Sequence, residues 1–229
     1  MIVSLRNSRL RNSIPRFGLL LVLVAAAERG SGQDVRPLAE AVDEHYNHLR
    51  TLQADFTETY RGAGADRVEA GTLWLKKPRK MRWEYRSPKG KLFVSDGKAV
   101  WFYLPGERQV RKTNPKQLDD LRSPLAFLLG KTKLESELQG LSKAVDVTPV
   151  ESGNTILRGV PRTMADRVSE VLLEVNGAHQ IVRIALTEVD GATTEFRFSG
   201  LRENEELSDR RFEFTPPLGV EVVEGEIGQ

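Results

Sequence analysis

Short alternating segments separated by tight turns constrain this chain more than any other feature of its sequence. In residues 80–86, Met81, Trp83 and Tyr85 alternate with charged residues, which is the period-two pattern of a strand with one buried face. Asp96-Gly97 is a two-residue hairpin signal between two such segments. About a dozen strands are predicted, at 52–60, 67–76, 80–86, two within 91–104, 108–112, 144–150, 155–159, 168–175, 180–189, 192–200 and 212–214. Strands joined by tight turns are antiparallel neighbours.

This number of strands determines the fold class. One antiparallel sheet of such a size must curl, and closing it removes its edges. Two helical stretches interrupt the strand pattern. Residues 35–50 have apolar positions at helical spacing, with Pro37 where a first turn tolerates it, and a leucine-rich run broken by Pro124 extends over 115–141. We therefore predict a mainly β protein, an antiparallel barrel or half-barrel with an N-terminal helix and a helical insertion.

The hairpin over 91–104 differs from the other predicted strands because both of its faces are apolar. We expect each face to contact something other than water. One face carries Val94, Ala99 and Trp101, and the other carries Phe93, Val100 and Phe102. Alternation separates two faces but does not orient them, so the pattern leaves open which face points into the fold.

The N-terminal residues predict a cleavable export signal. Four arginines and no acidic residue accompany an apolar run from Phe17 to Ala27 that ends in small residues, the order found in secretory signal peptides. The run is shorter than the roughly 20 residues that span a bilayer, and an uncleaved anchor is the alternative. We expect residues 1–27 to form the signal, with cleavage between 27 and 33, and residues 28–229 to form a single domain.

Charge and cysteine content exclude several classes of protein. The chain has 34 basic and 32 acidic residues, but the four arginines of the signal leave a balance of −2 once they are removed. The exported part therefore gives no reason to expect nucleic acid as a partner. The complete absence of cysteine excludes disulfides, thiolate metal sites and cysteine nucleophiles. It also leaves no cysteine on which this chain could itself be acylated as bacterial lipoproteins are.

No catalytic constellation stands out in the sequence. His45 and His48 lie three apart on the first predicted helix, where two metal ligands can share a face, but no third ligand accompanies them. A solvated helix face is the better interpretation, and His179 is expected to be exposed in a turn. Ser95 and Lys98 have a catalytic spacing but occupy the hairpin turn. We predict no enzyme, no cofactor and no metal site.

The apolar residues allow two interpretations. A curved sheet can enclose a cavity for an apolar ligand, with the helical insertion covering its mouth. Alternatively, the same residues form an ordinary packed core. The pattern alone leaves both possibilities open.

A series of motifs resembles one known family over nearly the whole exported chain, from about Leu38 to Val223. In chain order the motifs are Leu52–Thr57, Gly71–Pro78, Met81–Tyr85 with Pro88, Val94–Lys98, Val100–Tyr103, Gln109-Val110, Ser123–Leu125 and Phe212–Val220. Each motif is weak by itself, but their order and spacing are specific. The sequence resembles the LolA family of outer-membrane lipoprotein carrier proteins.

The resemblance implies an incomplete, half-open antiparallel barrel whose helices form a lid over an apolar cavity. It implies that the cavity takes the acyl chains of lipoproteins, received from an inner-membrane ATP-driven complex and delivered to an outer-membrane receptor. The carrier is then periplasmic, and we expect a monomer without a nucleotide site. The residues that the resemblance assigns to the cavity are Phe56, Leu73, Leu75, Met81, Trp83, Phe93, Leu125, Phe127 and Leu128.

One position departs from the family pattern. The residue before Pro78 is typically an arginine that holds the lid through hydrogen bonds to backbone carbonyls, and here it is Lys77. Lysine replaces arginine's planar fork of five donors with a compact ammonium that has three. Lys77 is the candidate lid latch, and we expect it to be less rigid. An ordinary strand-end lysine is the alternative, while Lys76 is expected to be solvated on the opposite face.

Three other functions are compatible with these features. A relative of the carrier could shuttle another lipid, such as a glycolipid. A lipid-sensing regulatory module is the second alternative, and it is expected to have an additional domain. An enzyme acting on lipid or cell-wall material is the third and weakest, because no histidine, cysteine or serine constellation supports it.

Overall fold

The computed structural model describes residues 1, 34–62, 64, 66–115, 128 and 133–225. The helices and strands reported below lie in the unit Gly32–Gln229. The expected export signal and its cleavage site fall outside the described residues, as do Leu125 and Phe127 of the expected lid. No helix within the described ranges combines the length and hydropathy needed to cross a bilayer.

The helix predicted over 35–50 is present as α1 (Arg36–His48). Pro37 occupies its first turn, where the fixed φ of proline suits a helix and its missing N–H leaves no hydrogen bond unmade. The buried residues of α1 are Ala39, Val42 and Tyr46. Of the predicted helical insertion, the described part contains Leu128, which is helical, and the short helix α4 (Leu134–Glu137).

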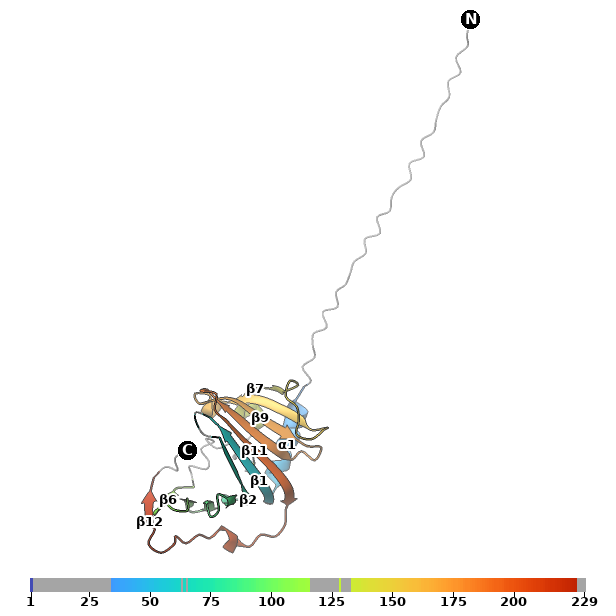
Figure 1. The fold of residues 1–229 in the computed structure, drawn as a ribbon. Helices are drawn as coiled ribbons and strands as arrows, with labels where there is room; N and C mark the ends of the chain where they lie inside the picture. The colour runs from blue at the N-terminus through green and yellow to red at the C-terminus, as the bar shows by residue number, and fades with distance from the viewer. Residues whose placement is uncertain (2–33, 63, 65, 116–127, 129–132, 226–229) are drawn as a thin grey trace. The chain divides into compact units, whose positions relative to one another are not determined.

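The strands of the described residues form one sheet in the order β12-β6-β5-β4-β3-β2-β1-β11-β10-β9-β8-β7. The first half consists of β1 (Thr51–Arg61), β2 (Arg67–Lys76), β3 (Lys80–Ser87), β4 (Leu92–Asp96), β5 (Val100–Tyr103) and β6 (Gln109–Thr113). The second half consists of β7 (Leu138–Lys143), β8 (Thr155–Pro161), β9 (Val168–Val175), β10 (Ile181–Glu188) and β11 (Thr193–Glu203), with the 3-10 turn η1 (Arg162–Met164) between β8 and β9. β1 and β11 pair over nearly their full length and join the halves (Figure 1).

The sheet is open, as predicted, but it is not wholly antiparallel. The strands at its ends in the described structure are β7 and β12 (Glu221–Glu224). β12 pairs with β6 in parallel, with Glu221 opposite Gln109. A parallel neighbour requires a crossover connection rather than a tight turn. Here the strand that precedes β12 in the chain is β11, and residues 204–220, which we call the strap, lead from β11 to β12 over one face of the first half of the sheet.

The strap explains why the 91–104 hairpin is apolar on both faces. The ring centroids of Phe214 and Trp101 lie 5.8 Å apart, and the guanidinium of Arg211 lies 4.6 Å from the centroid of the Trp74 ring. The strand predicted over 212–214 is wrong, because the strap forms the 3-10 turn η2 (Asp209–Phe212) there. Its aromatic residues cover the sheet instead of extending it.

The strand predicted over 144–150 lies earlier, as β7, where the sequence pattern is helical. Leu138 and Leu141 are three residues apart, as on a helix, but both belong to β7. Between them, Gly140 has φ +68° and the pairing with β8 shifts register. Such a bulge adds one residue to the strand and breaks its alternation, so the local pattern resembles a helix.

Candidate functional site

Six of the residues assigned to the cavity lie on one face of the sheet, which we call the inner face. They are Phe56, Leu73, Leu75, Met81, Trp83 and Phe93. Trp83 stands opposite Leu73 on β2 and opposite Phe93 on β4, and directly opposed residues share a face. Phe56 contacts the Trp83 ring edge-on, with centroids 4.7 Å apart. Phe93 is half-buried, and the other five are at most 2% exposed.

The same register identifies the inner face of the hairpin. Phe93 stands opposite Phe102, and Val94 stands opposite Trp101. Since Phe93 shares the face of Trp83, the set containing Phe102 points inward. The set containing Trp101 points outward to the strap.

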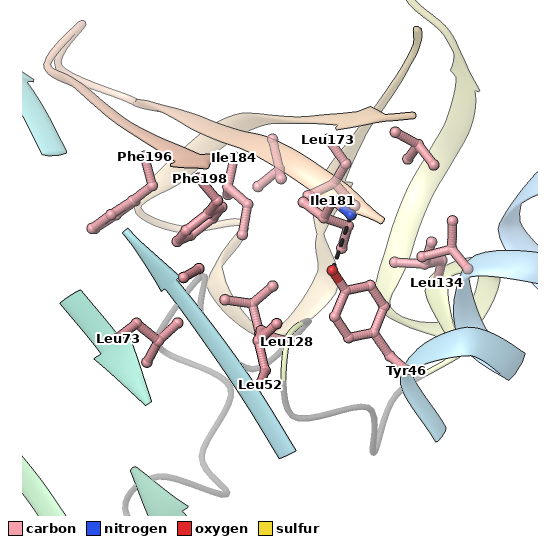
Figure 2. Packing of buried hydrophobic residues seen from close by; sticks show 14 of the residues in the cluster. Tyr46, Leu52, Leu73, Leu128, Leu134, Leu173, Ile181, Ile184, Phe196 and Phe198 are labelled. Atoms are coloured by element: carbon pink, nitrogen blue, oxygen red, sulfur yellow. Dashed lines mark hydrogen bonds between the residues drawn. The ribbon is translucent and has the colours of Figure 1, made fainter. Parts of the chain in front are cut away.

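Segments of the same chain cover the inner face. Leu128 is 1% exposed and Leu134 is 2% exposed, and both belong to the buried cluster that includes the inner-face residues. From α1 the cluster includes Ala39, Val42 and Tyr46, followed by Leu49. Figure 2 shows Tyr46 pointing from the helix toward Ile181, with Leu52 and Leu128 nearby. In the described structure the predicted cavity residues are therefore in contact with a protein cover.

Three polar contacts hold this cover in place. The Tyr46 hydroxyl accepts a hydrogen bond of 2.9 Å from the backbone N–H of Ile181. Both carboxylate oxygens of Asp43 lie 3.1 Å from the backbone nitrogen of Leu134, which donates to them at the start of α4. His45 Nε2 lies 3.0 Å from a carboxylate oxygen of Glu203 on β11. The expectation that His45 is solvated is thus wrong, because its ring ties α1 to the sheet.

Lys77 provides a further contact to α1. Its ammonium donates a hydrogen bond to the backbone carbonyl of Tyr46, and its own backbone N–H donates to the carbonyl of Arg50 at 2.9 Å. The predicted latch residue therefore reaches a backbone carbonyl of a covering helix. This covering helix is the N-terminal one, α1.

Lys76 lies on the outer face, as predicted, but it is not simply solvated. Its ammonium donates to the Leu207 carbonyl at 2.7 Å and pairs with Asp209 at 2.7 Å. Lys80 pairs with the same carboxylate at 2.9 Å. Hydrogen bonds from the two lysines lower the pKa of Asp209 to about 2. Lys76, the last residue of β2, thus contacts the strap, whereas Lys77, the next residue, contacts α1.

A cluster of polar side chains, which we call the polar cluster, lies where the apolar part of the inner face ends. It comprises Glu58, Glu69, Tyr85 and Lys91. Glu58 stands opposite Glu69 and accepts a hydrogen bond of 3.1 Å from the Tyr85 hydroxyl. Lys91 donates to Glu69 and lies 4.3 Å from the centroid of the Tyr85 ring. Burial raises the pKa of Glu58, with the charge of Lys91 opposing it.

Sequence reasoning missed the polar cluster, although a signal was present. The inner positions of β1 continue from Ala54 and Phe56 to Glu58 by simple alternation. A charged residue in an inward position was therefore visible, but its partners come from β2, β3 and the residue before β4.

The described residues contain no group of three or more histidine, cysteine, aspartate or glutamate side chains placed to hold a metal ion. His48 is exposed and bonds through Nδ1 to the Glu44 carbonyl at 2.9 Å. His179 is exposed in its turn, as expected. Ser95 is buried and donates to the carbonyl of Arg79 at 2.6 Å, which is a structural contact.

These features define a class: a protein built around an apolar sheet face that its own helical segments shield. The family model for "Outer membrane lipoprotein carrier protein LolA" matches residues 47–215, and the chain belongs to this family. Members of the family are periplasmic carriers of lipoproteins and are not enzymes.

Relatives match along most of the chain. A protein of Chromobacterium violaceum is 31% identical over 213 residues, which cover 93% of this chain and 99% of the relative. One of Neisseria gonorrhoeae is 29% identical over 204 residues, or 89% of this chain and 92% of the relative. Both are named outer-membrane lipoprotein carrier protein. Among solved structures, a LolA superfamily protein of Nitrosomonas europaea is 12% identical with a TM-score of 0.41. The match covers 79% of this chain and 97% of that one.

Proposed function

We propose that this protein carries acylated lipoproteins through the periplasm by binding their acyl chains at the inner face. The observation that carries the proposal is the cover of that face. Among the described residues, it consists of α1, Leu128 and Leu134 of α4. Each buried methylene contributes roughly 0.8 kcal/mol, so acyl chains need such a shielded apolar surface to cross water.

Exchange of the cover for cargo explains how binding can be tight and still reversible. Acyl chains that enter replace apolar contacts of α1 and of the insertion with equivalent contacts of their own. The net free energy of the exchange is then small, and loading becomes a shift between closed and open populations. Leu125 and Phe127 of the insertion belong to the same proposed binding surface.

Lys77 is proposed as the latch of this exchange. Its bond to the Tyr46 carbonyl exists only while the end of α1 lies on the sheet. Opening the cover breaks that bond, so Lys77 favours the closed state. As a single ammonium, it does so less rigidly than the arginine of the family would.

The proposed partners are an inner-membrane ATP-driven complex that loads the carrier and an outer-membrane receptor that unloads it. Energy for loading then comes from the complex, and the carrier needs no nucleotide site of its own. Export through the predicted signal would bring the chain to the compartment between these partners.

Native mass spectrometry of the protein purified from the periplasm of its host tests the proposal. We expect a fraction with a bound triacylated lipoprotein. Bound free glycolipid would replace this proposal with transport of another lipid. A protein without any ligand that also takes up no apolar fluorescent probe would refute binding at the inner face altogether.

A further inference from the structure

The indole nitrogen of Trp83 is buried and has no hydrogen-bond acceptor within the described structure. Trp83 is 1% exposed, and buried polar groups in native proteins nearly always have a partner. Trp74 has the second indole nitrogen of this kind, but it lies on the outer face beneath Arg211. Trp83 alone of these two faces the proposed cargo surface.

Three aromatic rings, which offer no oxygen or nitrogen acceptor, lie around Trp83 in the described structure. Phe56 of β1 lies 4.7 Å away between ring centroids, and Phe196 and Phe198 of β11 lie at 5.9 and 6.3 Å. These rings come from both halves of the sheet. Trp83 thus places a lone N–H donor at the junction of the two halves of the inner face.

Trp83 also lies at a boundary between apolar and polar surface. In one direction along β3 and β2 come Met81 and Leu75, which are at most 1% exposed. In the other direction comes Tyr85, which donates to Glu58. A molecule with hydrocarbon at one end and polar atoms at the other fits this order in one orientation only.

Resting on the proposed function, we propose that Trp83 Nε1–H donates a hydrogen bond to an ester carbonyl oxygen of the acylated cargo. The carbon chain then lies toward Met81 and Leu75, and the polar part of the cargo lies toward the polar cluster. An ester carbonyl is an acceptor without a donor of its own, and burying it without a partner is unfavourable.

The other polar groups on this face are already engaged. Tyr85 donates to Glu58, and Lys91 donates to Glu69. The carboxylates themselves offer acceptors, which a carbonyl oxygen cannot use. The Lys91 ammonium has three N–H groups, of which one donates to Glu69, but it lies in the polar cluster. Trp83 is the donor beside the apolar part of the inner face, and it has no acceptor within the described structure.

Two probes of matched length separate recognition of the carbonyl from recognition of the chain: dioctanoylglycerol, which has two esters, and the dioctyl ether of glycerol, which has none. Their affinities for the exported protein are measured by displacement of an apolar fluorescent probe. We expect the wild type to prefer the ester by roughly threefold to tenfold, the range of one net hydrogen bond. Trp83→Phe should bring the ratio of the two affinities to about one.

Trp74→Phe is the matched control, since it removes the other unpaired indole from the outer face and should leave the ester preference unchanged. An unchanged preference in Trp83→Phe, or equal binding of both probes by the wild type, would overturn the inference and leave the proposed function standing. Binding of neither probe would overturn both.

A second measurement needs no substitution at Trp83. The chain has three tryptophans, so its ¹⁵N-labelled form gives three indole signals, assigned with Trp74→Phe and Trp101→Phe. Ester addition should move the Trp83 indole proton downfield by more than the ether does. Identical shifts with both probes would contradict a bond to the carbonyl.

Discussion

The hydroxyl of Tyr46 and the backbone N–H of Ile181, 135 positions apart in the chain, form a hydrogen bond of 2.9 Å. The bond joins α1 to the first residue of β10, and the ring that carries it is 1% exposed. Burial raises the pKa of Tyr46, so the hydroxyl stays neutral. A single side chain thus supplies both apolar cover and a directional tie between the helix and the second half of the sheet.

Tyr46→Phe should loosen α1 without removing its apolar cover. The Ile181 N–H loses its acceptor in a buried place, which costs about 1–2 kcal/mol of unfolding free energy. Urea denaturation measures that loss, and faster hydrogen exchange of the α1 amides localises it. Tyr103→Phe, at a half-buried tyrosine on β5, is the control with an expected change near zero. Equal effects of the two substitutions would show that the hydroxyl of Tyr46 contributes nothing.

Lys77→Ala should increase the share of carrier that holds cargo, because it removes a bond made only in the closed state. Native mass spectrometry of periplasmic protein measures that share, and transfer to outer-membrane vesicles should slow in parallel. Lys76→Ala, on the outer face, is the matched control. Lys77→Arg, unlike Lys77→Ala, should release cargo as the wild type does. Normal loading and release in Lys77→Ala would remove Lys77 from the mechanism.

Glu174→Ala should destabilise the protein strongly. The carboxylate is fully buried on the outer face, 2.9 Å from Arg183 Nε, and it accepts a 2.8 Å bond from the backbone N–H of Val150. Removing one partner of a buried ion pair costs about 3–5 kcal/mol. Thermal and urea unfolding measure the loss.

Glu170→Ala is the control for Glu174. Glu170 lies on β9 like Glu174 and pairs with Arg158 of β8, but its side chain is 35% exposed. Surface pairs contribute at most about 1 kcal/mol. A smaller effect at Glu174 than at Glu170 would contradict the assignment of Glu174 as the buried anchor of the loop before β8.

The pH dependence of stability should also reveal that Glu174 is ionised in the folded protein. Burial raises its pKa, but hydrogen bonds from Asn154 and from the Val150 and Glu151 backbone outweigh that effect and hold the pKa below its usual range. Because the pKa is lower in the folded protein than the value of about 4.3 in the unfolded chain, the ionised Glu174 carboxylate stabilises the folded state above that pH. This contribution is lost as the pH falls. Wild type and Glu174→Gln should therefore converge in stability on acidification.

Asp43 should give the opposite pH dependence. Burial raises its pKa from 3.8 to about 6, although the Leu134 N–H bond opposes the rise. Ionisation then destabilises the folded state, so the stability of wild type relative to Asp43→Asn should be highest below pH 4. It should fall as the pH rises to 6 and level off above. A stability difference between wild type and Asp43→Asn that stays constant between pH 4 and 6 would contradict a raised pKa of Asp43.

Local alternation predicted much of the architecture. The pattern around Met81 and Trp83 depends on two neighbouring residues pointing to opposite faces of a strand, so it predicted β3 and its buried side directly. Alternation failed at Gly140, where a bulge produces helix-like spacing. It also failed in the strap, where Phe212 and Phe214 flank Glu213 as in a strand but do not join the sheet.

By itself the sequence determined a mainly β chain with an N-terminal helix, a set of inward-pointing apolar residues and a family resemblance that the matches confirm. Only the tertiary structure decided that Phe93 rather than Trp101 points inward, that Lys77 reaches the carbonyl of Tyr46, and that Glu58 meets Tyr85. Period-two alternation distinguishes two faces, but which face is inside depends on the segments that cover it. Those segments lie tens of residues away in the chain, and no local pattern encodes their position.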